Sequence, residues 1–262
     1  MSTPATPLPV RSSATGPAVP GSGLTAPGRF GWPATLALFL VPGAACTLWA
    51  LAVGPLLAAH GLPAVLAGSL SPVVPLELVL LLRLGRRATG RWGLRGIVGF
   101  RRRLPWWRLV ATAAALYLAG VGLHLALDPL STLVEDRHLG WMPDALAGDT
   151  AGTPHTATGL LVLLLGSVLL NGLVHPLVEE LYFRGWLLPR MPVAGTAAVV
   201  ANAALFSLQH FWQPQLYLLV FLVQLLVQLV LVRCGDLRVP VAVHCAVNLT
   251  GGALAVAAFL AT

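Results

Sequence analysis

Two adjacent glutamates and an arginine lie in one of the most apolar stretches of this 262-residue chain. Residues 160–188 are almost entirely apolar apart from His175, Glu179, Glu180 and Arg184. A charged side chain at the centre of a bilayer costs roughly 2.5–3.5 kcal/mol, so these charges must be paired, lie near an interface or face a wet cavity. On a helix, Glu180 and Arg184 can pair at the i,i+4 spacing. Glu179 then points about 100° away and is left without that partner.

Two more residue pairs at helical spacing follow in the C-terminal half of the chain. Phe206 and His210 share one face of a predicted helix, and His244 and Asn248 share a face of the last one. His and Asn can each donate a hydrogen bond, and two donors that converge in an apolar medium suit a developing oxyanion. The alternative is structural: His and Asn also serve as interhelical hydrogen-bonding groups in membranes.

Taken together, the motifs E-E-x-x-x-R, F-x-x-x-H and H-x-x-x-N resemble, in order and spacing, the CPBP family of intramembrane proteases. This family includes CAAX prenyl protease type II, bacteriocin-processing Abi proteins and lysostaphin resistance protein A-like domains. The resemblance covers roughly residues 157–255 and implies a helix bundle with a polar cavity open toward the cytoplasm.

The resemblance also implies a role for each matching residue. Glu179 and His210 would activate the water that attacks the scissile amide, and His244 and Asn248 would hold the oxyanion. The supporting residues would be Glu180, Arg184 and Phe206, with Arg184 bracing the glutamates. His175, one turn before Glu179, can either orient that glutamate or lie beside a kink at Pro176.

Members of the CPBP family are often called metalloproteases, so the chain could also bind a catalytic metal. A metal-dependent site would use Glu179, His210 and His244, with zinc as the metal, because three protein ligands and an open position suit catalytic zinc. However, the chain has no H-E-x-x-H motif, and Asn248 is better suited to hydrogen bonding than to zinc. We therefore expect a metal-free mechanism with no cofactor and keep zinc as the alternative.

Other functions fit the same residues less well. Gly166-Ser167-Val168 lacks the second glycine of a rhomboid-like serine site, and the only Asp outside residues 128–149 is Asp236 in a turn. A non-proteolytic immunity or scaffold protein of the same family is the main alternative. A small transporter is a third possibility, because intramembrane carboxylates also carry protons, but no inverted repeat is evident.

The composition is that of a membrane protein. The chain is 57% hydrophobic and only 10% charged, with a mean hydropathy of +0.82, whereas soluble domains carry about 25% charged residues. We predict an all-α, polytopic transmembrane helix bundle of about seven spans, with a range of six to eight. The predicted spans are residues 33–58, 62–83, 107–127, 157–181, 193–212, 214–232 and 239–260.

The charge distribution orients these spans. Nine arginines and no acidic residue lie in the loop 83–108, whereas five acidic residues and one arginine lie in 128–149. The positive-inside rule places the first loop in the cytoplasm and the acidic loop 128–156 outside, with a cytoplasmic N-terminus. Residues 1–30 are predicted to be a disordered Pro/Ser/Ala-rich tail, 31–156 to be the N-terminal spans and 157–262 to be the catalytic core.

We therefore expect a multi-pass protein of the cell membrane. Its partners would be the lipid bilayer and a peptide or membrane-protein substrate, prenylated or not. Anionic lipid headgroups account for the net charge of +7, so no nucleic-acid partner is expected. The arginine- and alanine-rich composition favours a GC-rich bacterial genome. The sequence predicts no oligomeric state.

Overall fold

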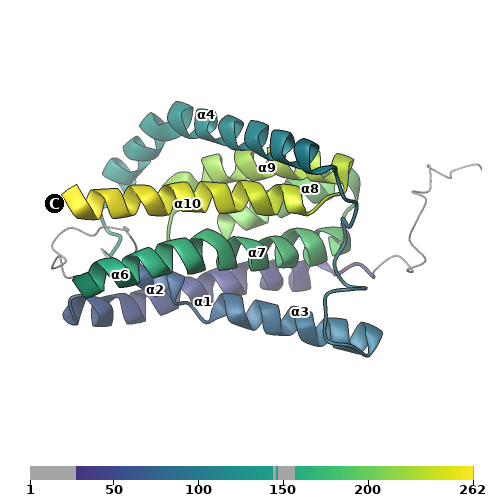
Figure 1. Ribbon diagram of the computed structural model, residues 1–262, viewed down its shortest axis with the longest axis horizontal. Helices are drawn as coiled ribbons and strands as arrows, with labels where there is room; N and C mark the ends of the chain where they lie inside the picture. The colour runs from purple at the N-terminus through teal and green to yellow at the C-terminus, as the bar shows by residue number, and fades with distance from the viewer. Residues whose placement is uncertain (1–27, 144–145, 147–156, 262) are drawn as a thin grey trace, which may run out of the picture.

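The computed structural model describes residues 28–143, 146 and 157–261, and these form a bundle of long helices (Figure 1). The predicted tail 1–30 lies almost entirely outside the described residues, as does most of the segment 144–156. The described residues contain helices, turns and one isolated bridge, but no strand. The predicted all-α, polytopic class is confirmed.

The helices follow the predicted spans with shifted ends. The N-terminal half contains α1 (Trp32–Ala59), α2 (Leu66–Ser69), α3 (Val73–Thr89) and α4 (Trp106–His138). A long helical segment follows, made of α6 (Ala157–Leu165), η1 (Gly166–Val174), α7 (His175–Glu179), η2 (Glu180–Leu187) and η3 (Leu188–Arg190). The chain ends with α8 (Gly195–Leu208), η4 (Pro214–Leu216), α9 (Tyr217–Cys234) and α10 (Arg238–Ala261).

Five of these segments are long and apolar enough to cross a membrane, judged by length and composition. They are residues Trp32–Ala59, Leu66–Thr89, Trp106–His138, Ala157–Arg190 and Pro214–Cys234. Many large apolar side chains on their outer faces are exposed, among them Leu48, Leu56, Leu118 and Leu125. An apolar outer surface of this kind is what lipid tails require.

Two segments differ in length from the prediction. The helix α4 continues to His138, eleven residues past the predicted end at 127, although Pro129 lies inside it. Its 33 residues span about 50 Å, which exceeds the roughly 30 Å hydrocarbon core, so the helix carries the first acidic residues beyond the lipid. The helix α8 is shorter than predicted and ends at Leu208 rather than at 212.

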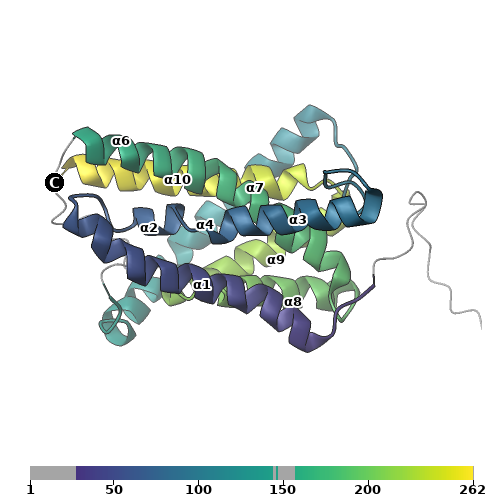
Figure 2. The ribbon, with the colours of Figure 1, turned by 90° about the horizontal axis from the view of Figure 1, so that it is seen from below.

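The helix α10 occupies a central position in the bundle. It lies along the α6–α7 segment on one side and contacts α4 and α9 on the other, whereas α1 and α3 lie across α6–α7 from it (Figures 1 and 2). Gly172 and Gly252 allow this close approach: a Cβ at Gly172 would meet Leu249 at 2.5 Å, and one at Gly252 would meet Ser167 at 3.1 Å. The segment that carries the glutamates is thereby packed against the helix that carries His244.

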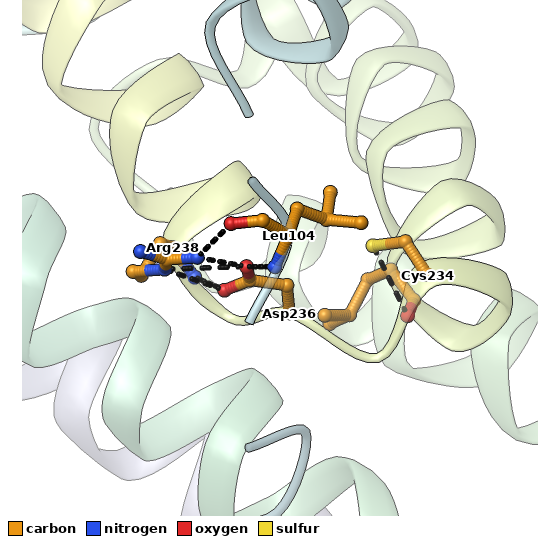
Figure 3. Close-up of polar contacts among 5 residues, drawn as sticks. Leu104, Cys234, Asp236 and Arg238 are labelled. Atoms are coloured by element: carbon orange, nitrogen blue, oxygen red, sulfur yellow. Dashed lines mark hydrogen bonds and ion pairs between the residues drawn. The ribbon is translucent and has the colours of Figure 1, made fainter. Parts of the chain in front are cut away.

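A polar cluster fixes the start of α10 to the arginine-rich loop (Figure 3). The Asp236 carboxylate accepts the Leu104 N–H at 2.7 Å and the Arg238 N–H at 3.0 Å, and it pairs with the Arg238 guanidinium at 2.6 Å. The same guanidinium donates to the Leu104 carbonyl oxygen at 2.8 Å. These contacts join residues 132 positions apart in the sequence. They therefore set where α10 begins, two turns before His244.

Candidate active site

The polar residues singled out from the sequence come from three parts of the fold. The helix α7 ends at Glu179, and η2 carries Glu180 and Arg184. The end of α8 supplies Phe206 and the following turn His210, whereas α10 supplies His244 and Asn248. The segments η1 and η2 have π-helical, i→i+5 hydrogen bonding, a feature that appears frequently at functional sites.

Both glutamates face the ring of His244. The Nδ1 atom of His244 lies 2.9 Å from Glu180 Oε1, and Nε2 lies 3.9 Å from Glu179 Oε2. The first contact is a hydrogen bond, and the second is too long for one. The side chains of Glu179 and His244 remain 19% and 13% exposed, whereas Glu180 is fully buried. The pair Glu179–His244 is thus the part of the cluster that a water or substrate can reach.

Arg184 lies beneath this pair and has no exposed surface. Its Nη1 atom is 3.3 Å from Glu180 Oε1, which confirms the predicted i,i+4 ion pair. The guanidinium carbon lies 3.7 Å from the centroid of the Phe206 ring, a cation–π contact. Glu180 consequently contacts two cationic or potentially cationic groups, Arg184 and His244, with one carboxylate oxygen.

The two glutamates have more contacts than the sequence predicts. Glu180 was expected to form only a structural pair with Arg184, and Glu179 to stand apart with no partner. In the structure Glu180 also binds His244, and Glu179 approaches the other nitrogen of the same ring. The two carboxylates lie at the junction of α7 and the π-helical η2, so the regular 100° rotation does not describe their directions.

The ring of His210 lies near the same cluster. Phe206 separates the two histidines, with its ring 4.8 Å from His210 and 6.2 Å from His244. A helix of 14 residues spans about 21 Å, which is too short to cross the hydrocarbon core, and His210 follows in the turn after α8. His210 Nδ1 lies 2.7 Å from the Phe206 carbonyl oxygen. A carbonyl only accepts, so Nδ1 carries the proton and Nε2 is free to accept one.

Asn248 reaches back to the π-helical segment η1. Its amide Nδ2 donates to the backbone carbonyl oxygen of Asn171 at 2.9 Å. Nothing in the sequence marks this partner, because the acceptor is a main-chain group. A second donor hydrogen remains on the Asn248 amide and can point toward a substrate oxygen.

Two buried residues near the site were not assigned a role from the sequence. Glu77 of α3 is 6% exposed, its Oε2 has no hydrogen-bond partner among the described residues, and it interacts electrostatically with Glu179. Asn202 of α8 is fully buried and donates to the Phe183 carbonyl oxygen at 3.0 Å. His175, one of whose two possible roles from the sequence was to orient Glu179, is buried and interacts with the backbone of Ser69.

The described residues do not form a metal-ligand set. No three His, Cys, Asp or Glu side chains among them converge as metal ligands would. His244 Nδ1 and His210 Nδ1 are engaged in hydrogen bonds, which leaves the Nε2 atoms as the ring nitrogens a metal could use. The three-ligand zinc site therefore stays an alternative prediction, and we derive no step through a metal.

The fold and site define a polytopic helical membrane protein with a partly accessible cluster of carboxylates and histidines in its C-terminal half. Residues 161–250 of the chain match a protein-family model, Rce1-like, described as type II CAAX prenyl endopeptidase Rce1-like. The match agrees with the resemblance to the CPBP family over this part of the chain, and the matching family model describes proteases. No curated protein and no solved structure gives a significant match.

Proposed function

We propose that the protein is an intramembrane endopeptidase that hydrolyses a peptide bond of a membrane-associated peptide or protein, prenylated or not. The observation that carries the proposal is the pair Glu179–His244, which is partly exposed on one side and anchored by buried charges on the other. A binding protein would not need a carboxylate and an imidazole held together at an accessible position. The family match supports a protease of the CAAX type.

In the proposed reaction, a water molecule binds between the Glu179 carboxylate and His210 Nε2. Glu179 accepts a proton from the water as its oxygen attacks the scissile carbonyl carbon, which gives a tetrahedral oxyanion. The protonated Glu179 then transfers that proton to the leaving amine as the C–N bond breaks. Water supplies both the hydroxyl of the new carboxyl group and the hydrogen of the new amine, so the reaction is balanced.

His244 and Asn248 would stabilise the oxyanion. His244 Nδ1 is engaged with Glu180, so only Nε2 can donate to substrate, and it must carry a proton to do so. The buried pair Glu180–Arg184 fixes the ring orientation before the charge develops, and such preorganised donors are typically worth 10²–10³-fold in rate.

The test is hydrolysis of a fluorogenic peptide library by the purified protein in lipid nanodiscs. We expect Glu179→Gln, which preserves shape, to lower kcat/KM by about 10²–10⁴-fold, the usual contribution of a general base. The matched control is Glu135→Gln on the exposed face of α4, which should leave cleavage unchanged. Undiminished cleavage by folded Glu179→Gln would overturn the proposal, and zinc-specific rescue after chelation would replace it with the metal-dependent alternative.

We further propose that the protein spans the cell membrane several times with its N-terminus in the cytoplasm. The nine arginines between residues 83 and 108 support this orientation, because they cluster around the linker between α3 and α4. The exposed Trp92, Trp106 and Trp107 beside them fit an interfacial belt.

A further inference from the structure

Four buried residues around the ion pair carry most of the unpartnered polar atoms in the described part of the chain. They are Glu180, Arg184, Asn202 and Gln228, and all four have no exposed surface. The atoms without a hydrogen-bond partner are Glu180 Oε2, the three Arg184 nitrogens, Asn202 Oδ1 and both amide atoms of Gln228. A buried polar atom without a partner costs about 1–3 kcal/mol, so such a concentration calls for an explanation.

The donors and acceptors in this group are complementary. Arg184 offers five N–H donors and no acceptor, whereas Asn202 Oδ1, Gln228 Oε1 and Glu180 Oε2 are acceptors. A cation whose donors face three amide and carboxylate oxygens is the arrangement that satisfies a buried guanidinium.

Two observations place Asn202 near Arg184. Its amide donates to the carbonyl oxygen of Phe183, the residue before Arg184, at 3.0 Å. In addition, Asn202 lies one turn before Phe206 on α8, and the Phe206 ring lies under the Arg184 guanidinium at 3.7 Å. The Asn202 side chain therefore lies between the main chain of η2 and the face of α8 that Arg184 covers.

Gln228 is a fully buried residue of α9. Its helical neighbour Leu231 packs in the apolar cluster of Phe183 and Phe206. The preceding residue, Val227, packs with Val243, which is adjacent to His244 in the chain. Gln228 thus lies on α9 between residues of these two apolar clusters.

We propose that Asn202 and Gln228 are positioning residues: their amides bind the Arg184 guanidinium through ordered water, and so hold Glu180 against the His244 ring. The proposal rests on the proposed endopeptidase function, because its consequence is a correctly oriented His244 Nε2. The alternative is that the two amides are buried without a partner and contribute only their volume.

Apolar variants of nearly the same shape distinguish a positioning role of the two amides from a role in filling volume alone. If the Gln228 amide has no partner, Gln228→Met removes a desolvation cost, so the protein becomes more stable and cleavage is unchanged. If it positions Arg184, Gln228→Met lowers kcat at least tenfold with KM unchanged and does not raise the melting temperature. Asn202→Leu should behave in the same way, and Gln228→Glu, which keeps an acceptor oxygen, should restore much of kcat. The matched control is Gln215→Met in η4, with no effect expected on kcat.

A second readout does not depend on proteolysis. In protein labelled with ¹⁵N-histidine, the Nδ1 and Nε2 signals of His244, assigned by their loss in His244→Gln, report the hydrogen bond to Glu180. We expect these signals to shift in Gln228→Met and Asn202→Leu but not in Gln215→Met. Unchanged signals and unchanged kcat would refute the positioning role while the endopeptidase stands. Shifted signals in a protein that cleaves no peptide would refute the endopeptidase and leave the network in place.

Discussion

At the scale of single residues, the site is organised around one imidazole ring held between two carboxylates. Glu180 is buried and also paired with Arg184, whereas Glu179 is partly exposed. Burial and pairing make Glu180 a fixed anchor, and exposure makes Glu179 the group that can exchange protons with a water. The two neighbouring glutamates thus differ in exposure and in partners, which is why the proposed mechanism gives them different roles.

The buried ion pair predicts a large loss of stability when one partner is removed. Arg184→Met leaves the Glu180 charge uncompensated by its cation in a site without exposed surface, which costs about 3–5 kcal/mol. We expect a marked fall in the melting temperature in nanodiscs, measured by intrinsic tryptophan fluorescence. The control, Arg103→Met on the exposed loop, should change the free energy of unfolding by less than about 0.5 kcal/mol.

The double variant Arg184→Met/Glu180→Leu sharpens this prediction. Replacing both charges by apolar groups should recover much of the stability, because no uncompensated charge remains. It should not recover cleavage, because His244 Nδ1 would lose its partner. A double variant as unstable as Arg184→Met alone would contradict the account of the pair.

The sequence predicts some contacts of the candidate site residues and misses others. Glu179 approaches His244, the Phe206 ring contacts both histidines, and the Glu180–Arg184 pair forms as its spacing predicts. The second contact of Glu180, to His244, was missed because a regular helical rotation was assumed where η2 is π-helical. The Asn171 carbonyl could not be predicted, since a main-chain acceptor leaves no mark on residue type.

At the scale of elements, the short α8 determines where His210 lies. Spans predicted from apolar length alone placed a full crossing at 193–212, which would have carried His210 to the outer face. The turn after Leu208 ends the helix earlier and keeps His210 beside Phe206. Helices that are apolar on all sides carry no periodic signal, so neither this end nor the two π-helical segments is visible in the sequence.

The packing of α1 against the end of α8 yields a prediction at this scale. A Cβ added at Gly43 of α1 would collide with the carbonyl group of Gln209, the residue before His210. We expect Gly43→Ala to cost about 1–3 kcal/mol, because the backbone of Gln209 must move, and to lower kcat by displacing His210. The comparison is Gly122→Ala in α4, which has open space at its Cβ and should be neutral or slightly stabilising.

The effects of Gly43→Ala and Gly122→Ala are measured as melting temperature and kcat on the same samples. A loss of stability with unchanged kcat would show that the contact supports the bundle but does not position His210. Equal behaviour of Gly43→Ala and Gly122→Ala would contradict the close approach of α1 altogether.

At the scale of the whole molecule, one loop couples the two halves of the chain. The arginine-rich segment runs beneath the start of α10, where Gly235 accepts the Arg102 N–H at 2.9 Å and Leu237 donates to Phe100 at 3.0 Å. Asp236 completes this junction with its contacts to Leu104 and Arg238. The sequence identified the arginines as a cytoplasmic belt, but it gave no sign that a lone aspartate 132 positions away binds the belt's backbone.

Because Asp236 is ionisable, this junction makes the stability of the bundle depend on pH at the acidic end of the scale. Burial alone would raise the pKa of Asp236, but hydrogen bonds from Arg238 and from the backbone of Leu104 and Arg238 outweigh it, so its pKa lies below the usual value. A carboxyl whose folded pKa is depressed stabilises the fold above its unfolded pKa of about 3.9, and this contribution is lost as pH falls through the folded pKa. Asp236→Asn should therefore lower the melting temperature by a constant amount between pH 5 and 8. Below about pH 4 the gap to the unmodified protein should narrow, and a gap that instead widens there would contradict the depressed pKa.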